Sequence, residues 1–206
     1  KYPESAWAAE AGERAEQIRL VIAEVFGGTI TASVTPEQTA KVRTIQYRDA
    51  RLLFAQGQIE NAKARLLRVL NQFPDASESV GALGDLARCY MQTIIDNPDD
   101  ELYADLVIGH LAERFSQRPE TRGLAGDEIV RLAEFWLEGG RADKRAHVYD
   151  LFFINFPTHA MASSYMLSFG ERRYQEKDYP AALSYFRQVE QAYSNSPAAF
   201  AAMNRI

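Results

Sequence analysis

The sequence predicts an all-α fold of stacked helical hairpins, and two observations support this prediction. Small and apolar residues between Ala50 and Pro74 recur after a shift of 83 positions, and most recur again after a shift of 120. Each copy joins two stretches whose apolar residues lie three or four positions apart, the spacing of one helix face. Such self-similarity is typical of repeat proteins, in which each unit buries its apolar face only against its neighbours. The clearest copy consists of Ala50, Phe54, Gly57, Ile59, Ala62, Leu66, Val69, Phe73 and Pro74.

The start of the chain is predicted to hold one helix and a loop. Residues Glu4 to Phe26 carry small and apolar side chains at steps of three and four, and Gly27-Gly28 ends that pattern. Residues 29–34 form a short segment of β-branched and small residues, which we interpret as a loop. We therefore expect residues 1–34 to form an N-terminal helix and linker that pack on the array.

The first hairpin is expected to begin at Thr35. Thr35 is a suitable N-cap, Pro36 suits the first helical turn, and Gln38 occupies the capping-box position. This helix is predicted to run to about Gln56 and to turn at Gly57.

Further helices follow in the same order. A helix from Ile59 to Phe73 ends before Pro74, because proline disfavours a helical conformation in the residue before it. The next helix pair is predicted to be joined by a turn at Asp96-Asn97-Pro98. The inner face of its second helix is predicted to consist of Leu102, Leu106, Gly109, Ala112 and Phe115. The array of residues 35–206 divides into approximate hairpins at 35–74, 75–118, 119–156 and 157–196, with an unfinished helix at 197–206.

The recurring residues resemble those of the tetratricopeptide repeat (TPR). That repeat needs a small residue where its two helices cross, here Ala50, Ala133 or Gly170, and a bulky apolar residue in its second helix. The turn from Tyr174 to Leu183 is similar to the family's most frequent one, and with Phe186 and Tyr193 it resembles TPR proteins of the bacterial cell envelope. The resemblance implies a right-handed α-solenoid of about four to five degenerate TPR-like hairpins. It also implies a periplasmic or envelope-associated location.

Two departures from the family pattern are expected to change the local geometry. The pair at residues 75–117 lacks the glycine turn and the early small residue in their usual places. Arg145 stands where the third hairpin needs a small residue, and a long side chain spreads a close helix crossing. We therefore expect a degenerate superhelix.

Composition and motifs argue against several classes of function. The net charge is −5 with no basic block, which argues against nucleic-acid binding, and no run of 18 apolar residues could span a membrane. His110, His147 and His159 lack metal-ligand spacing, and Cys89 is predicted to be a buried thiol. We expect no cofactor, no metal and no catalytic activity.

The resemblance implies that a protein or peptide partner binds the concave face, which the first helix of each hairpin lines. Its arginines could hold carboxylates through bidentate bonds, whereas the alternative is a solvated helix face. Tyr47, Tyr90, Tyr174 and Trp136 are the candidates for an aromatic-lined groove, against the alternative of core packing. The residues predicted to bind the partner are Tyr47, Arg48, Arg51, Asp85, Arg88, Gln92, Arg131, Glu134, Glu171 and Gln175.

The sequence therefore favours a non-catalytic protein-protein interaction scaffold that binds a peptide or protein in the concave groove of a TPR superhelix. One alternative is a structural segment of a longer or self-associating assembly. Phe200, Met203 and Ile206 would form the C-terminal edge of such a homo-oligomer. A third reading is a solenoid that binds a small ligand or a glycan.

Overall fold

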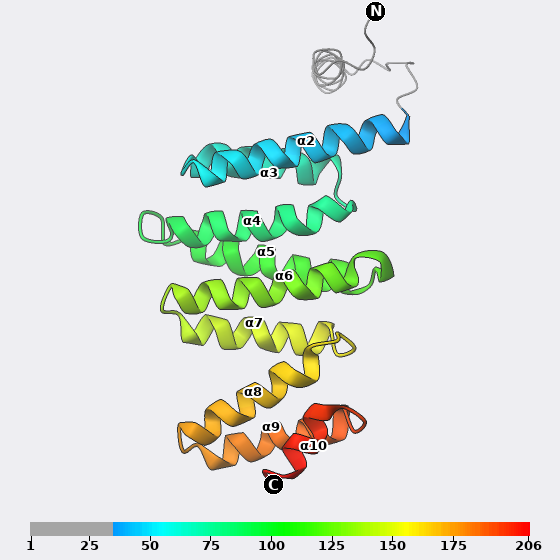
Figure 1. The fold of residues 1–206 in the computed structure, drawn as a ribbon. Coiled ribbons are helices and arrows are strands. Elements are labelled where there is room, and N and C mark those ends of the chain that lie inside the picture. The colour runs from blue at the N-terminus through cyan, green and yellow to red at the C-terminus, as the bar shows by residue number, and fades with distance from the viewer. Residues whose placement is uncertain (1–34) are drawn as a thin grey trace, which may run out of the picture. The chain divides into compact units, whose positions relative to one another are not determined.

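The computed structural model describes residues 35–206, and this part of the chain is all-helical (Figure 1), which confirms the predicted all-α class. The chain divides into two compact units, one up to Ile108 and one from Gly109 to Ile206. The boundary lies inside α5, and each unit is described by itself. The helices of the described range are α2 (Pro36–Ala55), α3 (Ile59–Gln72), α4 (Ser77–Thr93), α5 (Asp100–Ser116), α6 (Pro119–Glu138), α7 (Ala142–Asn155), α8 (Ala162–Gln175), α9 (Tyr179–Ala192) and α10 (Pro197–Met203).

The first described helix begins and ends as its sequence predicts. The Thr35 hydroxyl accepts a hydrogen bond from the Gln38 amide at 3.2 Å, and the Gln38 side chain accepts one from the Thr35 amide at 3.0 Å. These reciprocal bonds are a capping box, which satisfies two backbone donors that the helix start would otherwise leave unpaired. At the other end Gly57 has a φ of +74°, a left-handed conformation in which glycine carries no steric penalty.

In the first unit, α2 packs on α3, and both pack on α4. Ala50 and Ala62, each fully buried, allow α2 and α3 to approach closely. Cys89 lies in the same core, and its thiol is completely buried, as predicted from the sequence. The buried residues of this core are Ala50, Ala62, Leu66, Val69, Ala82, Leu86 and Cys89.

The prediction of the inner face of α5 is wrong for the first half of the helix. Leu102 and Leu106 are 60% and 59% exposed, and a Cβ added at Gly109 would meet no atom within 4 Å. The helix is apolar on more than one side, so the spacing of three and four fits two stripes equally well. Both stripes share Ala112 and Phe115, and the buried one consists of Ala104, Ile108, Leu111, Ala112 and Phe115.

In the second unit, α6 packs on α7, α8 packs on α9, and α10 packs on both α8 and α9. Gly140 turns the first pair with a φ of +77°, and Lys177 takes the equivalent place in the second pair with a φ of +63°. Gly170 lies at the contact between α8 and α9, where an added Cβ would lie 2.5 Å from Cε1 of Phe186. The glycine is therefore required for this close helix crossing.

Helix α8 begins at Ala162. Just before it, the Nδ1 atom of His159 accepts a hydrogen bond from the Met161 amide at 3.3 Å. The predicted helix at residues 4–26, its Gly27-Gly28 stop and the loop at residues 29–34 lie outside the described residues. Within the described range no helix is both long and apolar enough to cross a membrane.

Candidate functional site

Four of the predicted binding residues come together on α2 and α4. The Tyr47 hydroxyl donates to Oδ2 of Asp85 at 2.9 Å, and Arg88 donates to Oδ1 at 2.8 Å. Nε of Arg51 lies 3.5 Å from Oδ2 of the same carboxylate, and its guanidinium lies 5.9 Å from the Tyr47 ring centre. We call Tyr47, Arg48, Arg51, Asp85 and Arg88 the arginine face.

A glycine on α4 makes this arrangement possible. An added Cβ at Gly81 would lie 2.9 Å from Cζ of Tyr47 and closer still to its hydroxyl. The absence of a side chain at Gly81 therefore gives Tyr47 room to reach Asp85. Because the Asp85 side chain is only 10% exposed, its hydrogen bonds are protected from water and fix the positions of the groups around it.

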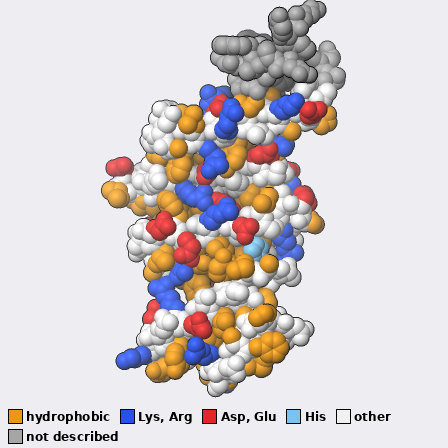
Figure 2. Space-filling model, in the orientation of Figure 1, with side chains coloured by type: hydrophobic (Ala, Val, Ile, Leu, Met, Phe, Trp, Pro, Cys, Tyr) orange, Lys and Arg blue, Asp and Glu red, His pale blue; other side chains and the backbone are white. Residues whose placement is uncertain are grey.

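The outer part of the arginine face is open to solvent. The side chains of Arg48 and Arg51 are 73% and 65% exposed, and Arg48 lies 3.9 Å from Asp49. Figure 2 shows Lys and Arg side chains gathered over α2 and α4. Gln92, further along α4, is also exposed. The Arg51 guanidinium is thus close to Asp85 on one side and largely open to solvent, where a partner carboxylate could reach it.

The predicted residues on α6 lie in the second unit and make local contacts. Arg131 pairs with Glu128 at 3.0 Å, and the Arg131 side chain is 67% exposed. Glu134 accepts a hydrogen bond from the Tyr149 hydroxyl at 2.7 Å and pairs with Arg145 at 3.0 Å. Glu134 therefore links α6 to α7.

Arg145, which is expected from its place in the repeat pattern to spread a helix crossing, is mostly buried. Its side chain is 16% exposed, and its guanidinium lies 5.3 Å from the ring centres of both Tyr149 and Phe169. Burial and the Glu134 carboxylate raise the pKa of Tyr149 well above its usual value. The long side chain is accommodated by an ion pair and two aromatic rings.

Glu171 and Gln175 line a small cavity at the end of the second unit. Its volume is about 210 Å³, and Tyr174, Phe186 and Arg205 complete its walls. Arg205 lies 3.5 Å from Glu171 and 6.0 Å from the ring centre of Tyr174. This cavity again combines a carboxylate, an arginine and a tyrosine.

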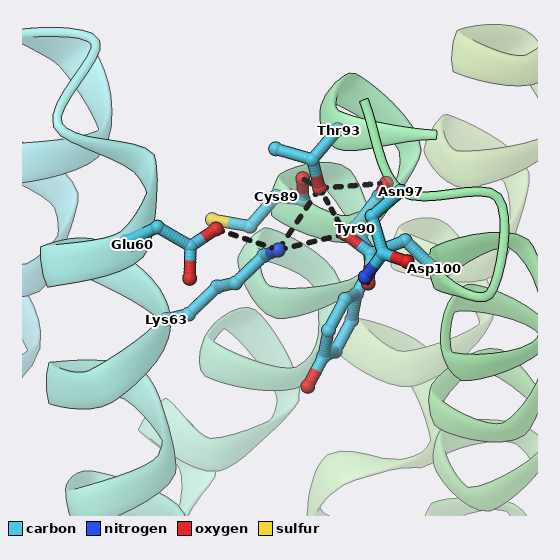
Figure 3. A network of polar contacts seen from close by, with 7 residues as sticks. All are labelled: Glu60, Lys63, Cys89, Tyr90, Thr93, Asn97 and Asp100. Carbon is cyan, nitrogen blue, oxygen red and sulfur yellow. Dashed lines mark hydrogen bonds and ion pairs between the residues drawn. The ribbon is translucent and has the colours of Figure 1, made fainter. Parts of the chain in front are cut away.

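A larger cleft in the first unit was not predicted from the sequence. It measures about 930 Å³ and lies between α3, the end of α4 and the start of α5. Its floor is Lys63, whose Nζ donates to Asp100 at 2.8 Å, to Thr93 at 2.9 Å and to Glu60 at 2.9 Å (Figure 3). We call it the Lys63 cleft. Thr93 also donates to Asp100, and Nζ lies 4.7 Å from the Tyr90 ring centre.

The charges at the floor of the Lys63 cleft stabilise one another. Burial alone would lower the pKa of Lys63, but hydrogen bonds to Asp100 and Glu60 outweigh it and raise that pKa. Burial alone would raise the pKa of Asp100, but bonds from Lys63 and Thr93 hold it below its usual value. Lys63 is therefore a protonated structural group, and its amine is unsuited to act as a nucleophile.

The remaining candidates are structural in character. Burial raises the pKa of the Cys89 thiol to about 12, so the reactive thiolate does not form near neutral pH. Trp136 is 3% exposed and belongs to the core, whereas Tyr90 lines the Lys63 cleft. Within residues 35–206 no group of three or more His, Cys, Asp or Glu side chains is placed to hold a metal ion. His159 instead pairs with Asp127 at 3.3 Å.

Comparison of the chain with protein-family models, with curated proteins and with solved structures found no match.

Proposed function

We propose that this chain is a non-catalytic scaffold of TPR-like hairpins. It binds a peptide or protein partner by contacting acidic groups of that partner. The observation that carries the proposal is the arginine face of α2 and α4. Two exposed arginines stand there beside a tyrosine and a buried carboxylate that fix their surroundings.

The chemistry of this face favours a partner carboxylate. Arginine presents its donors in a planar fork that matches the two oxygens of a carboxylate. Asp85 holds one edge of the Arg51 guanidinium and Tyr47 lies beside it, so less side-chain freedom is lost on binding. The formal charge of the five residues is +2, because three arginines outnumber Asp85.

A peptide selection tests this proposal. Random peptides displayed in a library would be selected on the full chain, and dissociation constants of the enriched peptides measured. We expect acidic peptides, with affinity reduced by roughly tenfold or more in an Arg48→Glu, Arg51→Glu variant, because charged hydrogen bonds contribute about 1.5–3 kcal/mol.

Arg65 and Arg68 provide the matched control, since both are exposed on α3 outside this face. The Arg65→Glu, Arg68→Glu variant should keep the original affinity. Equal loss in both variants, or enrichment of peptides without acidic residues, would contradict the proposal.

Association through the C-terminal edge is a second candidate. Phe200, Met203 and Ile206 are 61%, 42% and 54% exposed, and apolar groups so exposed favour contact with another protein surface. Sedimentation at increasing concentration would test this candidate. A monomer at every concentration would eliminate it, and a dimer lost in a Phe200→Ser, Met203→Ser variant would support it.

A further inference from the structure

We infer that the first unit has a second docking surface, the Lys63 cleft together with the exposed side of α5, and that it binds a basic amphipathic segment of a protein partner. This surface uses α3, the end of α4 and α5, and its charge is opposite to that of the arginine face. The inference goes beyond the proposed function and does not depend on it.

The cleft has the size and the charge for a cationic side chain. Its volume of about 930 Å³ is at the upper end of the range for ligand sites. Three carboxylates line it, those of Glu60, Asp96 and Asp100, against the single ammonium of Lys63. Asp100 is buried and held by Lys63, whereas the Glu60 side chain is 79% exposed and Asp96 is exposed. Two carboxylates therefore remain accessible to an incoming cation.

The rigid floor of the cleft shows which chemistry these groups favour. Carboxylates, a hydroxyl and a tyrosine ring already surround one ammonium group, that of Lys63 (Figure 3). The exposed carboxylates of Glu60 and Asp96 are the groups left to bind a lysine or arginine from a partner. The Tyr90 ring is engaged by Lys63 and lies 5.4 Å from the Tyr103 ring, which leaves less of it for stacking on a sugar.

An apolar strip continues from the cleft along α5. Leu102, Tyr103 and Leu106 are 60%, 47% and 59% exposed, and Leu67 on the cleft wall is 42% exposed. Tyr103 connects the two parts, because it contacts Tyr90 inside the cleft. We call Leu102, Tyr103 and Leu106 the α5 strip. A segment with leucines on one face and a flanking lysine would bury this strip while its cation entered the cleft.

Two synthetic peptides test the inference by fluorescence anisotropy with the full chain carrying Arg48→Glu and Arg51→Glu, so that the arginine face does not bind the acidic peptide. Both place leucines at helical spacing, and one has lysines where the other has glutamates. We expect the lysine peptide to bind and the glutamate peptide to bind at least tenfold more weakly, with an affinity that falls as salt is added.

Exposed positions allow variants that leave the core intact. The double variant Glu60→Gln, Asp96→Asn should bind the lysine peptide with roughly fivefold lower affinity. The double variant Leu102→Ser, Leu106→Ser should show a similar loss of affinity. Matched controls on α6, Glu138→Gln and Leu124→Ser, should leave binding unchanged, because both residues are exposed and neither lines the cleft or belongs to the α5 strip.

Several results would overturn the inference. They are equal binding of the two peptides, no binding of either, or equal losses in the cleft variants and the α6 controls. Binding of the chain to anionic vesicles that is lost in the Leu102→Ser, Leu106→Ser variant would assign the strip to a membrane surface instead. A concentration-dependent dimer lost in that variant would assign it to a second copy of the chain.

Discussion

Replacing Gly170 by alanine tests whether α8 and α9 meet as closely as the structure requires. In a helix interior, glycine to alanine ordinarily stabilises by about 0.5–1 kcal/mol, because alanine loses less backbone entropy. At Gly170 the new Cβ would lie 2.5 and 2.7 Å from two ring carbons of Phe186 and 3.2 Å from Cβ of Tyr185. Phe186 is 1% exposed and belongs to the core that α8, α9 and α10 share.

Overpacking of such a core costs about 1–3 kcal/mol, which exceeds the gain in helix propensity. We therefore expect Gly170→Ala to lower the free energy of unfolding by about 1 kcal/mol. Gly123 on α6 is the matched control, since it is exposed and an added Cβ would meet nothing within 4 Å. Gly123→Ala should raise the free energy of unfolding by about 0.5–1 kcal/mol.

Urea unfolding followed by circular dichroism measures both changes, with unchanged slopes showing that the midpoints report stability. A Phe186→Leu background adds a specific check, because leucine lacks the ring carbons that the new methyl group would overlap. In that background the penalty of Gly170→Ala should shrink or reverse, which would appear as a coupling free energy between the two positions. Stabilisation by Gly170→Ala in the wild-type background would refute the reasoning.

Three other outcomes are expected. Lys177→Gly should stabilise by about 1 kcal/mol and Gly57→Ala should destabilise by a similar amount in urea unfolding, because both positions have a positive φ that disfavours a Cβ; changes of the opposite sign would contradict this. Asp100→Asn should cost about 3 kcal/mol near neutral pH, because the buried Lys63 ammonium loses the buried one of its two carboxylate partners and keeps the exposed Glu60. Since the pKa of Asp100 is held below its usual 3.8, the wild-type advantage is present above that pH and should fade in unfolding measurements as the pH drops below it; a difference independent of pH would be inconsistent. Cys89 should react with a thiol reagent only as the protein unfolds, and prompt labelling of the folded chain would show that the thiol is accessible.

Local signals in the sequence predicted the helices well. The Thr35 capping box and the turn at Gly57 depend on residues only a few positions apart. Gly170 was likewise predicted as the small residue of a close helix crossing, because the requirement recurs at a fixed place in each copy of the pattern. Features of this kind can be predicted because their causes are local.

Features that depend on helix phase or on distant partners were harder to predict. Leu102 and Leu106 belong to a stripe with good helical spacing, yet the neighbouring stripe through Ile108 is the buried one. The Lys63 cleft was missed because Lys63 and Asp100 are far apart in sequence. One signal was available, since Lys63 directly follows the buried Ala62 on the inner side of α3.

The predicted binding residues divide in the same way. Tyr47, Arg51, Asp85 and Arg88 meet because residues at matching positions of α2 and α4 lie side by side. Glu134, chosen by the same positional rule, instead binds Arg145 and Tyr149 on α7. Position in the repeat predicted where a residue lies on its helix, but the side chain's partner was set by its length and charge.

The central claim is that the arginine face of α2 and α4 binds an acidic partner segment. The most direct measurement is a cross-linking map with a selected acidic peptide that carries a photoreactive group next to its carboxylates. Cross-links should concentrate on α2 and α4 close to Arg51 and Asp85, and unlabelled peptide should compete them away. Competed cross-links that fall elsewhere and persist in the Arg48→Glu, Arg51→Glu variant would contradict the claim.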